Sequence, residues 1–532
     1  MADTQVILGL GRGGRKRLGR RRRKRLASPG RTPLARGRRS AVAIAGRLWN
    51  PPEVPMSQTS GQAWKAGAGP FLWLAGLLSL TRLLRLGEWG LWIDEAYTWA
   101  DLHHALDSDQ IFNPWGYRAI GAMVALLGGE PSEGALRLAP CLVGIACVPL
   151  TWWAFRPVLG SRRAAFAALL VATSAWHVYW SQSARFYTLA QAVSLLGVGL
   201  FLRGSWQRQG PAGGRILTAA GIGVVLLAGA LHPSAALLAG PLVGVAFWRR
   251  AGGSRPWPRG VLAVSLALGA LLVLLAGPRA FEALANHASQ KPVEHWGGGV
   301  AHLLLTCGYF FTPPLLAGAA GGAWSGLRRR EPFIGFALAV VVLSAALVTA
   351  LATQVVMSAQ YAFVLLPWAA VLASALLAPL ARDDFRRRDL AFAALLLLPA
   401  LANMALYFVV REGERPAWRA AYEFVDAQRR TGDLVLGMAA PVGEFYLGGA
   451  NADLRHPETV STLSEWFPDG PRRWTRHARR IWVVVRPQWF DGLRERDAER
   501  IEAWLRSECR LVRRFAVDME GRDLDVHVYL RE

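Results

Sequence analysis

The sequence predicts a mainly α-helical fold, in which a membrane bundle of about eleven spans is followed by a small α/β domain. The 532 residues are 53% hydrophobic and only 18% charged, which does not fit a soluble domain of this length. Apolar runs long enough to cross a bilayer recur between residues 71 and 410, and short basic connections separate them. After residue 410 the composition becomes that of a soluble domain.

The expected spans follow from the apolar runs and their boundaries. Every second connection between them is rich in arginine, and all of these connections fall on the same side as the N-terminus. The positive-inside rule makes that side cytoplasmic. We therefore expect a multi-pass protein of the cell (inner) membrane. The spans are roughly 70–87, 137–156, 163–181, 185–203, 215–232, 234–248, 260–277, 299–320, 333–353, 360–380 and 389–410.

Three domains are expected on this basis. Residues 1–62 are rich in arginine, glycine, proline and serine and are predicted to form a disordered basic cytosolic tail. A retention signal, sequence ahead of a start at Met56, or binding of anionic lipid or RNA are readings that stay open for this tail. Residues 63–410 form the membrane domain, with a large first extracytoplasmic loop at 88–136.

The third domain, residues 411–532, is expected to be a small extracytoplasmic α/β domain. Two apolar segments, 433–438 and 480–486, have the composition of buried strands. Residues 497–508 have helical spacing, and 511–518 with 524–530 are expected to form a closing strand pair.

The net charge of +24, from 61 Lys and Arg against 37 Asp and Glu, invites a nucleic-acid interpretation. More than half of the excess lies before Arg47, and the other basic residues sit in short loops, where topology explains them. We therefore expect no nucleic-acid partner. Of the four cysteines, three lie in expected spans and Cys509 stands alone, so neither a disulfide nor a metal cage is predicted.

The first candidate site is the adjacent pair Asp94-Glu95, in the segment LWIDEAYTW just after the first span. Ionisable groups near membrane depth are costly and usually functional. Successive side chains diverge by about 100° on a helix, so one carboxylate can act as a general base while its neighbour binds substrate or orients another group. A helix cap with a solvated neighbour is the simpler alternative.

The second candidate is the segment SQSARFY, which contains Gln182, Arg185 and Tyr187 between the third and fourth expected spans. An arginine at the extracytoplasmic end of a helix runs against the positive-inside bias. We expect such a cation to have an anionic partner, which could be a phosphate, a carboxylate or Asp94-Glu95 itself. His232 and Lys291 lie on the same side. Each of these residues also has a simpler alternative role. Gln182 and Tyr187 could belong to the belt at the membrane interface, and the Arg185 side chain could extend along the membrane surface towards water. His232 could end a helix, and Lys291 could lie in a solvated loop.

With these residues placed, the chain resembles the polytopic glycosyltransferases of the GT-C class. The resemblance is to the family 39-like group, which contains protein O-mannosyltransferases and lipid A aminoarabinose transferases. It extends from Leu83 to about Leu390, in the order of that group. The matching segments are LWIDEAYTW, ALRLAPCLVG at 135–144, WSQSARFYTLAQAVSLLG at 180–197, LHPSAALL at 231–238 and SAQYAFVLLPWAAVLASALL at 358–377.

The resemblance implies an inverting transfer of a sugar from a polyprenyl-phosphate-linked donor to an extracytoplasmic acceptor, which is a protein, a lipid or a glycan. Asp94 would be the catalytic base, with Glu95 in support. The residues implied for the donor phosphate or substrate are Arg185, Tyr187, Gln182, Arg137, His232 and Lys291. Metal dependence varies within the class, so a divalent metal stays open and no metal ligand is assigned.

Two departures from the group's pattern affect these roles. Asn113-Pro114 stands where the group often has His-Pro-Pro, and Gln360-Tyr361 stands where it commonly has Arg-Tyr. The second change removes a cation that could bind phosphate, which makes Lys291 a candidate to compensate.

A lipid or sugar transporter or flippase, and a non-catalytic envelope scaffold of GT-C shape, are the alternatives to an enzyme. Transporters commonly carry mid-membrane charges and an internal repeat, for which the sequence gives little support.

Overall fold

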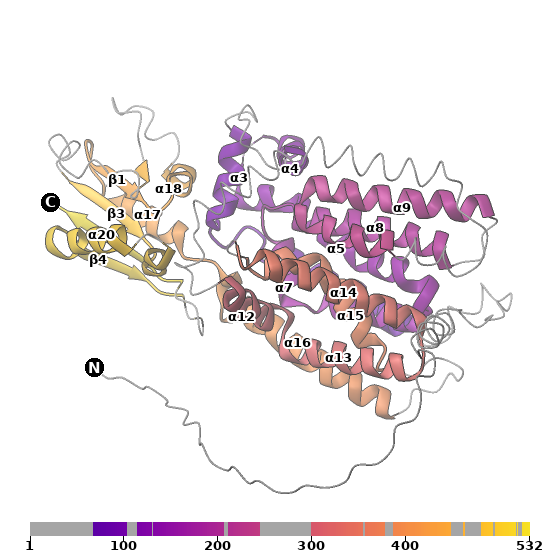
Figure 1. Ribbon diagram of the computed structural model, residues 1–532. Coiled ribbons are helices and arrows are strands. Elements are labelled where there is room, and N and C mark those ends of the chain that lie inside the picture. The colour runs from indigo at the N-terminus through magenta and orange to yellow at the C-terminus, as the bar shows by residue number, and fades with distance from the viewer. Residues whose placement is uncertain are drawn as a thin grey trace, which may run out of the picture. The chain divides into compact units, whose positions relative to one another are not determined.

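The structure is a computed structural model that describes most of the chain (Figure 1). All described residues lie within one compact unit, residues 53–532. The described ranges are 68–103, 114–129, 131–206, 211–244, 299–354, 357–377, 387–447, 461–462, 480–492, 495–517, 519 and 524–532.

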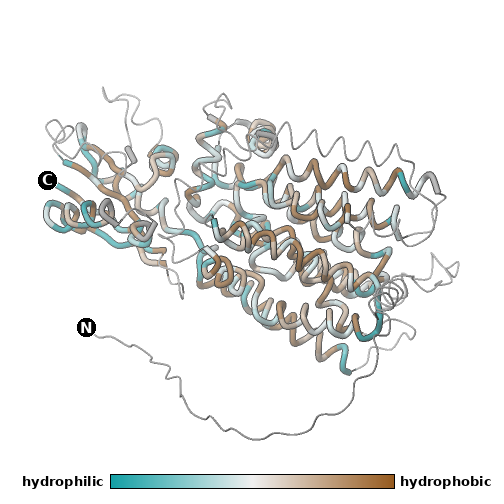
Figure 2. Tube along the Cα trace, viewed as in Figure 1, coloured by the Kyte–Doolittle hydropathy of each residue, from teal (hydrophilic) through white to brown (hydrophobic). Residues whose placement is uncertain are grey.

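Up to residue 409 the described chain is helical, and its longer helices run alongside one another (Figure 1). Hydrophobic residues are concentrated along these helices (Figure 2). The elements are α2 (Gly69–Ser79), η1 (Leu80–Leu83), α3 (Ile93–His103), α4 (Pro114–Leu126), α5 (Glu133–Leu159), α6 (Ser161–Ala172), α7 (Ala175–Ser181), α8 (Tyr187–Trp206), α9 (Pro211–Leu231), η2 (Pro233–Leu238), α12 (Gly299–Phe311), α13 (Pro313–Arg328), α14 (Pro332–Leu351), η4 (Ala359–Leu365), α15 (Leu366–Ser374) and α16 (Arg387–Val409).

Within the described ranges, five helices are long and apolar enough to cross a membrane: α5, α8, α9, α14 and α16. The bent pair α12 and α13 makes a sixth if it counts as one span. The protein is therefore a multi-pass membrane protein, as expected. The count of about eleven spans stays a prediction, because 260–277 lies outside the described residues and 234–248 lies only partly within them.

Two expected spans are not continuous helices. The span expected at 163–181 is divided into α6 and α7, and the hydroxyl of Ser174 accepts a hydrogen bond from the His177 amide at the start of α7. The span expected at 299–320 bends by 89° between α12 and α13, where Thr312 has φ 65° and Pro313 follows. A proline at the first helical position begins a helix without losing an internal hydrogen bond, so apolar composition alone does not reveal this break.

A fully buried arginine stabilises the break between α6 and α7. The Arg82 guanidinium donates to the carbonyls of Val171 at 3.2 Å and Ala172 at 3.3 Å, and it lies 2.9 Å from the Nδ1 atom of His177. The last carbonyls of a helix have no partner within the helix. Arg82 therefore satisfies the end of α6 and fixes the start of α7, the helix that leads into SQSARFY.

Residues after 409 fold around a five-stranded mixed sheet with strand order β2-β1-β3-β5-β4. The first three of these strands are parallel, and β5 runs antiparallel to both β3 and β4. The strands and the helix expected from sequence are confirmed. The elements are η5 (Glu412–Glu414), α17 (Trp418–Gln428), β1 (Leu434–Gly437), α18 (Ala440–Leu447), β2 (Ser461–Thr462), β3 (Ile481–Val485), η7 (Pro487–Gly492), α20 (Glu495–Glu508), β4 (Arg510–Phe515) and β5 (Val526–Arg531).

The central strand β3 is buried on both faces, and its side chains alternate between two apolar clusters. Trp482 and Val484 belong to the cluster that also contains Val442 of α18 and Ala96 of α3. The intervening residues of β3 pack with Trp504 of α20. The sheet and α3 thus share one core, which brings the C-terminal elements against the helix that begins with Asp94-Glu95.

Candidate functional site

Asp94 and Glu95 occupy the first turn of α3, where a negative charge is favoured by the exposed amides of the helix. The Glu95 carboxylate accepts a hydrogen bond of 2.7 Å from the Trp92 amide and so caps its own helix. Glu95 is fully buried, whereas Asp94 is partly exposed. The two carboxylates therefore face different surroundings, as their positions on a helix predict.

Arg137 of α5 binds Glu95 through two parallel hydrogen bonds. Its Nε atom lies 2.8 Å from Glu95 Oε1, and its Nη2 atom lies 2.8 Å from Oε2. The Ala184 amide donates to Oε1 at 2.7 Å, and Arg415 adds an ion pair at 3.4 Å. Burial alone would raise the pKa of Glu95, but Arg137 and Arg415 together lower it from 4.5 to about 2. Glu95 is therefore a permanent anion at neutral pH.

The remaining donors of Arg137 fix the chain that leads into α3. They bond the carbonyls of Leu86 at 3.2 Å, Trp89 at 2.8 Å and Gly90 at 2.8 Å. With its two bonds to Glu95, the guanidinium uses all five of its N–H groups. No N–H group of Arg137 is left to bind a phosphate. Arg137 can therefore act by positioning the segment that leads into α3.

Gln182 is likewise occupied within the protein. Its Nε2 atom donates to the carbonyls of Arg82 at 2.9 Å and Leu84 at 2.6 Å. Its Oε1 atom accepts a hydrogen bond of 2.9 Å from the Tyr407 hydroxyl of α16. The side chain therefore connects η1, the end of α7 and α16, beneath the loop that carries Arg185.

Arg185 is different, because the described residues engage only the Nη1 atom among its three nitrogens. Its Nη1 atom donates to the Asp94 carbonyl and the Thr98 hydroxyl, both at 3.1 Å, and to the Tyr117 hydroxyl at 3.5 Å. Within the described ranges no hydrogen bond is made by Nε, which is buried, or by Nη2. Burial opposes the charge, but Asp94 and Tyr117 raise the pKa of Arg185 above its ordinary value. Nε and Nη2 form the edge with which arginine binds a phosphate or carboxylate in two places.

Aromatic rings lie next to the Arg185 guanidinium. The Arg185 guanidinium lies 4.9 Å from the centre of the Phe186 ring, and the Tyr187 ring lies 4.5 Å from the ring of His232. Tyr361 of η4 lies 6.0 Å from His232, and the Asp94 charge acts on the hydroxyls of both tyrosines. Asp94, Arg185, Tyr187 and His232 are therefore brought together.

His232 also has a local structural role. Its Nδ1 atom accepts from the Ser234 amide at the start of η2 and lies 2.6 Å from the Ser234 hydroxyl. Lys291 lies outside the described residues, so its predicted role stays a prediction. In the part of the chain that the structure describes, no group of three or more His, Cys, Asp or Glu side chains gathers as metal ligands would.

Three partners in this arrangement were missed from sequence: Arg415, Thr98 and Tyr117. Arg415 follows the last span on the same side as Arg185, and the rule that singled out Arg185 applies equally to it. Its Nη2 atom donates to the Ser183 hydroxyl at 2.5 Å, and its guanidinium lies 3.9 Å from the centre of the Tyr179 ring. Thr98 and Tyr117 carry no sequence signal that distinguishes them from other residues of the loop.

Two solved membrane proteins share this fold. ArnT from Cupriavidus metallidurans bound to undecaprenyl phosphate is 16% identical, over 88% of this chain and 98% of its own, with a TM-score of 0.52. The oligosaccharyltransferase of Archaeoglobus fulgidus in the apo form is 13% identical, over 82% of this chain and 72% of its own, with a TM-score of 0.51. No protein-family model and no curated protein matches the chain.

Both structures belong to the GT-C glycosyltransferases. The fold resemblance that the motifs predict is therefore confirmed: this chain has a GT-C-like membrane fold, and it contains a small sheet after residue 409. At these sequence identities the likeness is one of fold, and the chemistry must be argued from the residues of the site.

Proposed function

We propose that the protein is an integral-membrane glycosyltransferase that moves a sugar from a polyprenyl-phosphate-linked donor to an acceptor hydroxyl. The observation that carries the proposal is that Arg185 lies beside the charge of Asp94 and that its Nε and Nη2 atoms make no hydrogen bond to the described residues. A neighbouring cation and carboxylate match the two charges that such a transfer must handle, a phosphate leaving group and an acceptor proton. That ArnT of the same fold was solved with undecaprenyl phosphate supports the choice of donor.

The proposed reaction is a single displacement. The acceptor oxygen forms a bond to the anomeric carbon, the bond from that carbon to the phosphate oxygen breaks, and its electron pair leaves with the polyprenyl phosphate. The acceptor proton passes to the Asp94 carboxylate. Because the nucleophile enters opposite the leaving group, the anomeric configuration inverts. Arg185 stabilises the charge on the departing phosphate, with Nη2 as the donor that its other contacts leave available.

Glu95, Arg137 and Gln182 act as positioning residues in this scheme. Glu95 contacts Arg137 and the Ala184 amide, so it joins α3, α5 and the SQSARFY loop at one buried point. This arrangement places Asp94 and Arg185, which come from different segments, next to each other before a substrate binds. Tyr187 and His232 form the aromatic wall beside them.

We further propose the sidedness that the arginine distribution predicts. The N-terminus would be cytoplasmic, and the site and the sheet of residues 411–532 would be extracytoplasmic. The acceptor would then reach Asp94 from the aqueous side, while the donor lipid would enter from the membrane.

The proposal is tested with purified protein in lipid nanodiscs and radiolabelled polyprenyl-phosphate sugars of several kinds. A cell-envelope extract supplies acceptors, and transfer of label is measured for wild type, Arg185→Gln and Arg185→Lys. Arg185→Gln should lower transfer at least about 100-fold, since removing a donor to a developing oxyanion costs roughly that much. Arg185→Lys should restore part of it, because lysine keeps the charge but lacks the planar edge.

Arg510→Gln is the matched control, because Arg510 is an exposed arginine of β4, a strand at the edge of the sheet. It should transfer label as wild type does. Full activity in Arg185→Gln would contradict the proposed phosphate contact. Absence of transfer by wild type with every donor and with the complete extract would favour the transporter or scaffold alternatives.

A further inference from the structure

The segment that connects η1 to α3, residues 84–92, carries the chain into Asp94 and has neither helix nor strand of its own. Backbone carbonyls in such a segment need partners from other parts of the protein. Five consecutive carbonyls, those of residues 86–90, are bound by the guanidinium groups of two arginines. Arg137 of α5 binds the first, fourth and fifth of these carbonyls, and Arg419 of α17 binds the second and third.

Arg419 reaches the segment from the first turn of α17, among the residues that form the sheet and its helices. Its Nη1 atom donates to the Glu88 carbonyl at 3.0 Å, and its Nη2 atom donates to the Gly87 carbonyl at 2.7 Å. The Glu133 carboxylate at the start of α5 accepts from Nε at 2.9 Å and from Nη2 at 2.6 Å. Because the guanidinium is planar, this carboxylate fixes the direction in which the two Nη atoms point.

A second contact to the segment comes from Tyr446 of α18. Its hydroxyl accepts a hydrogen bond of 2.6 Å from the Leu91 amide. A Cβ atom at Gly90 would lie 3.2 Å from this hydroxyl and 3.4 Å from the carbonyl of Pro416, so glycine permits the close approach of the two chains. Both α17 and α18 therefore contact the segment that leads into α3.

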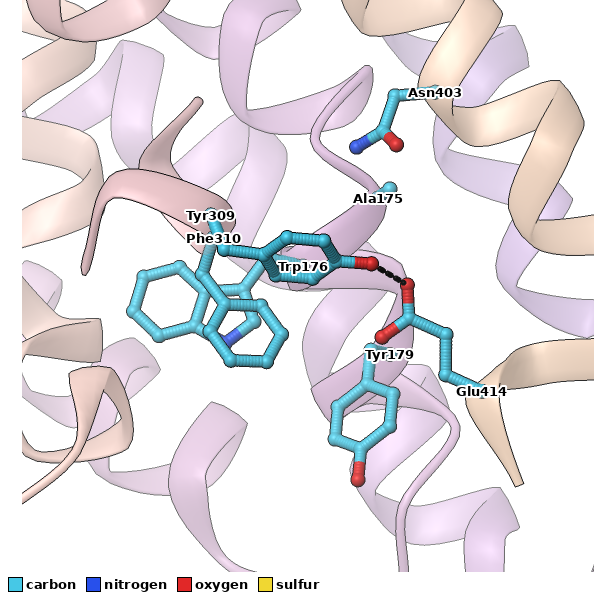
Figure 3. Close-up of a pocket in the computed structure, with 7 residues that line it drawn as sticks. All are labelled: Ala175, Trp176, Tyr179, Tyr309, Phe310, Asn403 and Glu414. Carbon is cyan, nitrogen blue, oxygen red and sulfur yellow. Dashed lines mark hydrogen bonds between the residues drawn. The ribbon is translucent and has the colours of Figure 1, made fainter. Parts of the chain in front are cut away.

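The connection between α16 and α17 holds Arg419 in this position. The Tyr309 hydroxyl of α12 donates to Glu414 Oε1 at 2.9 Å, as Figure 3 shows. The next residue, Arg415, forms the ion pair with Glu95 at 3.4 Å. Two consecutive residues of the connection are thus bound to helices on the N-terminal side of the chain, which places the first turn of α17 beside the segment.

We propose that Arg419 and Tyr446 are positioning residues for Asp94, which gives the residues after α16 a part in the transfer. The inference rests on the proposed function for the reaction in which Asp94 takes the acceptor proton. The segment is held by α5 on one side and by α17 and α18 on the other, so the start of α3 is fixed before a substrate binds. Arg185 belongs to a different segment. We therefore expect loss of these contacts to slow the chemical step and to leave donor binding nearly unchanged.

The first measurement is hydrogen–deuterium exchange of the peptide 84–95 in the full chain in lipid nanodiscs. Arg419→Gln should speed exchange of its amides at least about tenfold, the factor that corresponds to one hydrogen bond to a charged group. Tyr446→Phe, which keeps the ring, should speed exchange of the Leu91 amide about fivefold, because it removes one neutral hydrogen bond. Arg506→Gln is the matched control, at an arginine of α20 whose side chain is 74% exposed, and should exchange as wild type does.

The second measurement is transfer of label, with kcat and the KM for the donor determined separately. Arg419→Gln should lower kcat about tenfold and change this KM less than about twofold, because displacing a catalytic group by less than about 1 Å has an effect of this order. Arg419→Lys should recover part of the loss, because lysine keeps the charge but lacks the planar fork. Adding Arg419→Gln to Asp94→Asn should slow transfer no further, since both changes act on the same base.

Wild-type exchange in both Arg419→Gln and Tyr446→Phe would overturn the inference, and so would a further loss of transfer when Arg419→Gln is added to Asp94→Asn. If Arg419→Gln fails to fold, which circular dichroism checks, Tyr446→Phe decides alone. The proposed function fails in a different way, when wild type transfers label from no donor. The exchange measurement then still decides whether Arg419 and Tyr446 hold the segment.

Discussion

Asp94 and Glu95 are neighbours in the chain, yet they lie in opposite environments. Glu95 is fully buried, and its oxygens are occupied by Arg137, Arg415 and the Ala184 amide. Asp94 is partly exposed beside Arg185, two of whose nitrogens make no hydrogen bond to the described residues. One first turn of helix therefore holds both a buried structural anion and the carboxylate that we propose as the general base. The sequence alone does not reveal this difference between two adjacent carboxylates.

The largest expected effect on stability comes from removing the buried charge. Glu95→Gln leaves Arg137 and Arg415 without their anion and should destabilise the protein by about 3–5 kcal/mol. The measurement is thermal unfolding in nanodiscs. Glu499→Gln, at an exposed glutamate of α20, is the matched control and should melt as wild type does. Equal melting temperatures of the two variants would show that the buried ion pair of Glu95 and Arg137 does not stabilise the protein.

The same comparison predicts a pH dependence. The pKa of Glu95 is lowered from 4.5 to about 2, so the folded state binds its proton less readily than the unfolded state. The stability that Glu95 contributes is therefore fully present above pH 4.5 and is lost as the pH falls towards about 2. Acid unfolding curves of wild type and Glu95→Gln should converge in this window, since the variant has no such proton to bind. Parallel curves would contradict the assigned ion pair.

The two arginines around Glu95 should differ in importance. Arg137 makes two short bonds to the carboxylate and three to backbone carbonyls, whereas Arg415 approaches it at 3.4 Å. Arg137→Gln should therefore lower the melting temperature more than Arg415→Gln does, by about the effect of Glu95→Gln. A larger loss in Arg415→Gln would place the centre of the network at the end of η5 instead.

A smaller effect is expected from the hydroxyl that supports Gln182. Tyr407→Phe removes the hydrogen bond of 2.9 Å to Gln182 Oε1 and keeps the ring. It should cost about 1 kcal/mol, the usual value for one such bond, and lower the transfer rate only slightly. A loss of transfer as large as that of Arg185→Gln would show that Gln182 acts directly on a substrate.

Sequence reasoning found the elements that local patterns encode. Helical spacing predicts α20, and short continuous apolar runs predict β1 and β3, because such patterns are a property of short segments. The breaks at Ser174 and Thr312 escaped prediction, since both interrupt continuous apolar runs and depend on contacts such as the one from Arg82. Apolar composition reports that a segment is in the membrane, not that it is one helix.

The candidate site was found only in part, for a related reason. Adjacent carboxylates and an arginine against the charge bias marked Asp94, Glu95 and Arg185, which are rare residue types for their place. Which carboxylate is buried depends on Arg137 and on Arg415, which lies 320 positions after Glu95 in the sequence. Such long-range pairs have no signature in one sequence. Only the structure separates the fully buried Glu95 and Arg137 from the partly exposed Asp94 and Arg185.

The most direct test of the central claim is transfer of label by Asp94→Asn beside Asp426→Asn, an exposed aspartate of α17. The account predicts that Asp94→Asn melts as wild type does, still binds undecaprenyl phosphate, and transfers sugar at least about 100-fold more slowly, since a general base contributes roughly that much or more. Asp426→Asn should transfer at the wild-type rate. Wild-type transfer by Asp94→Asn would contradict the account and would move the base to another residue.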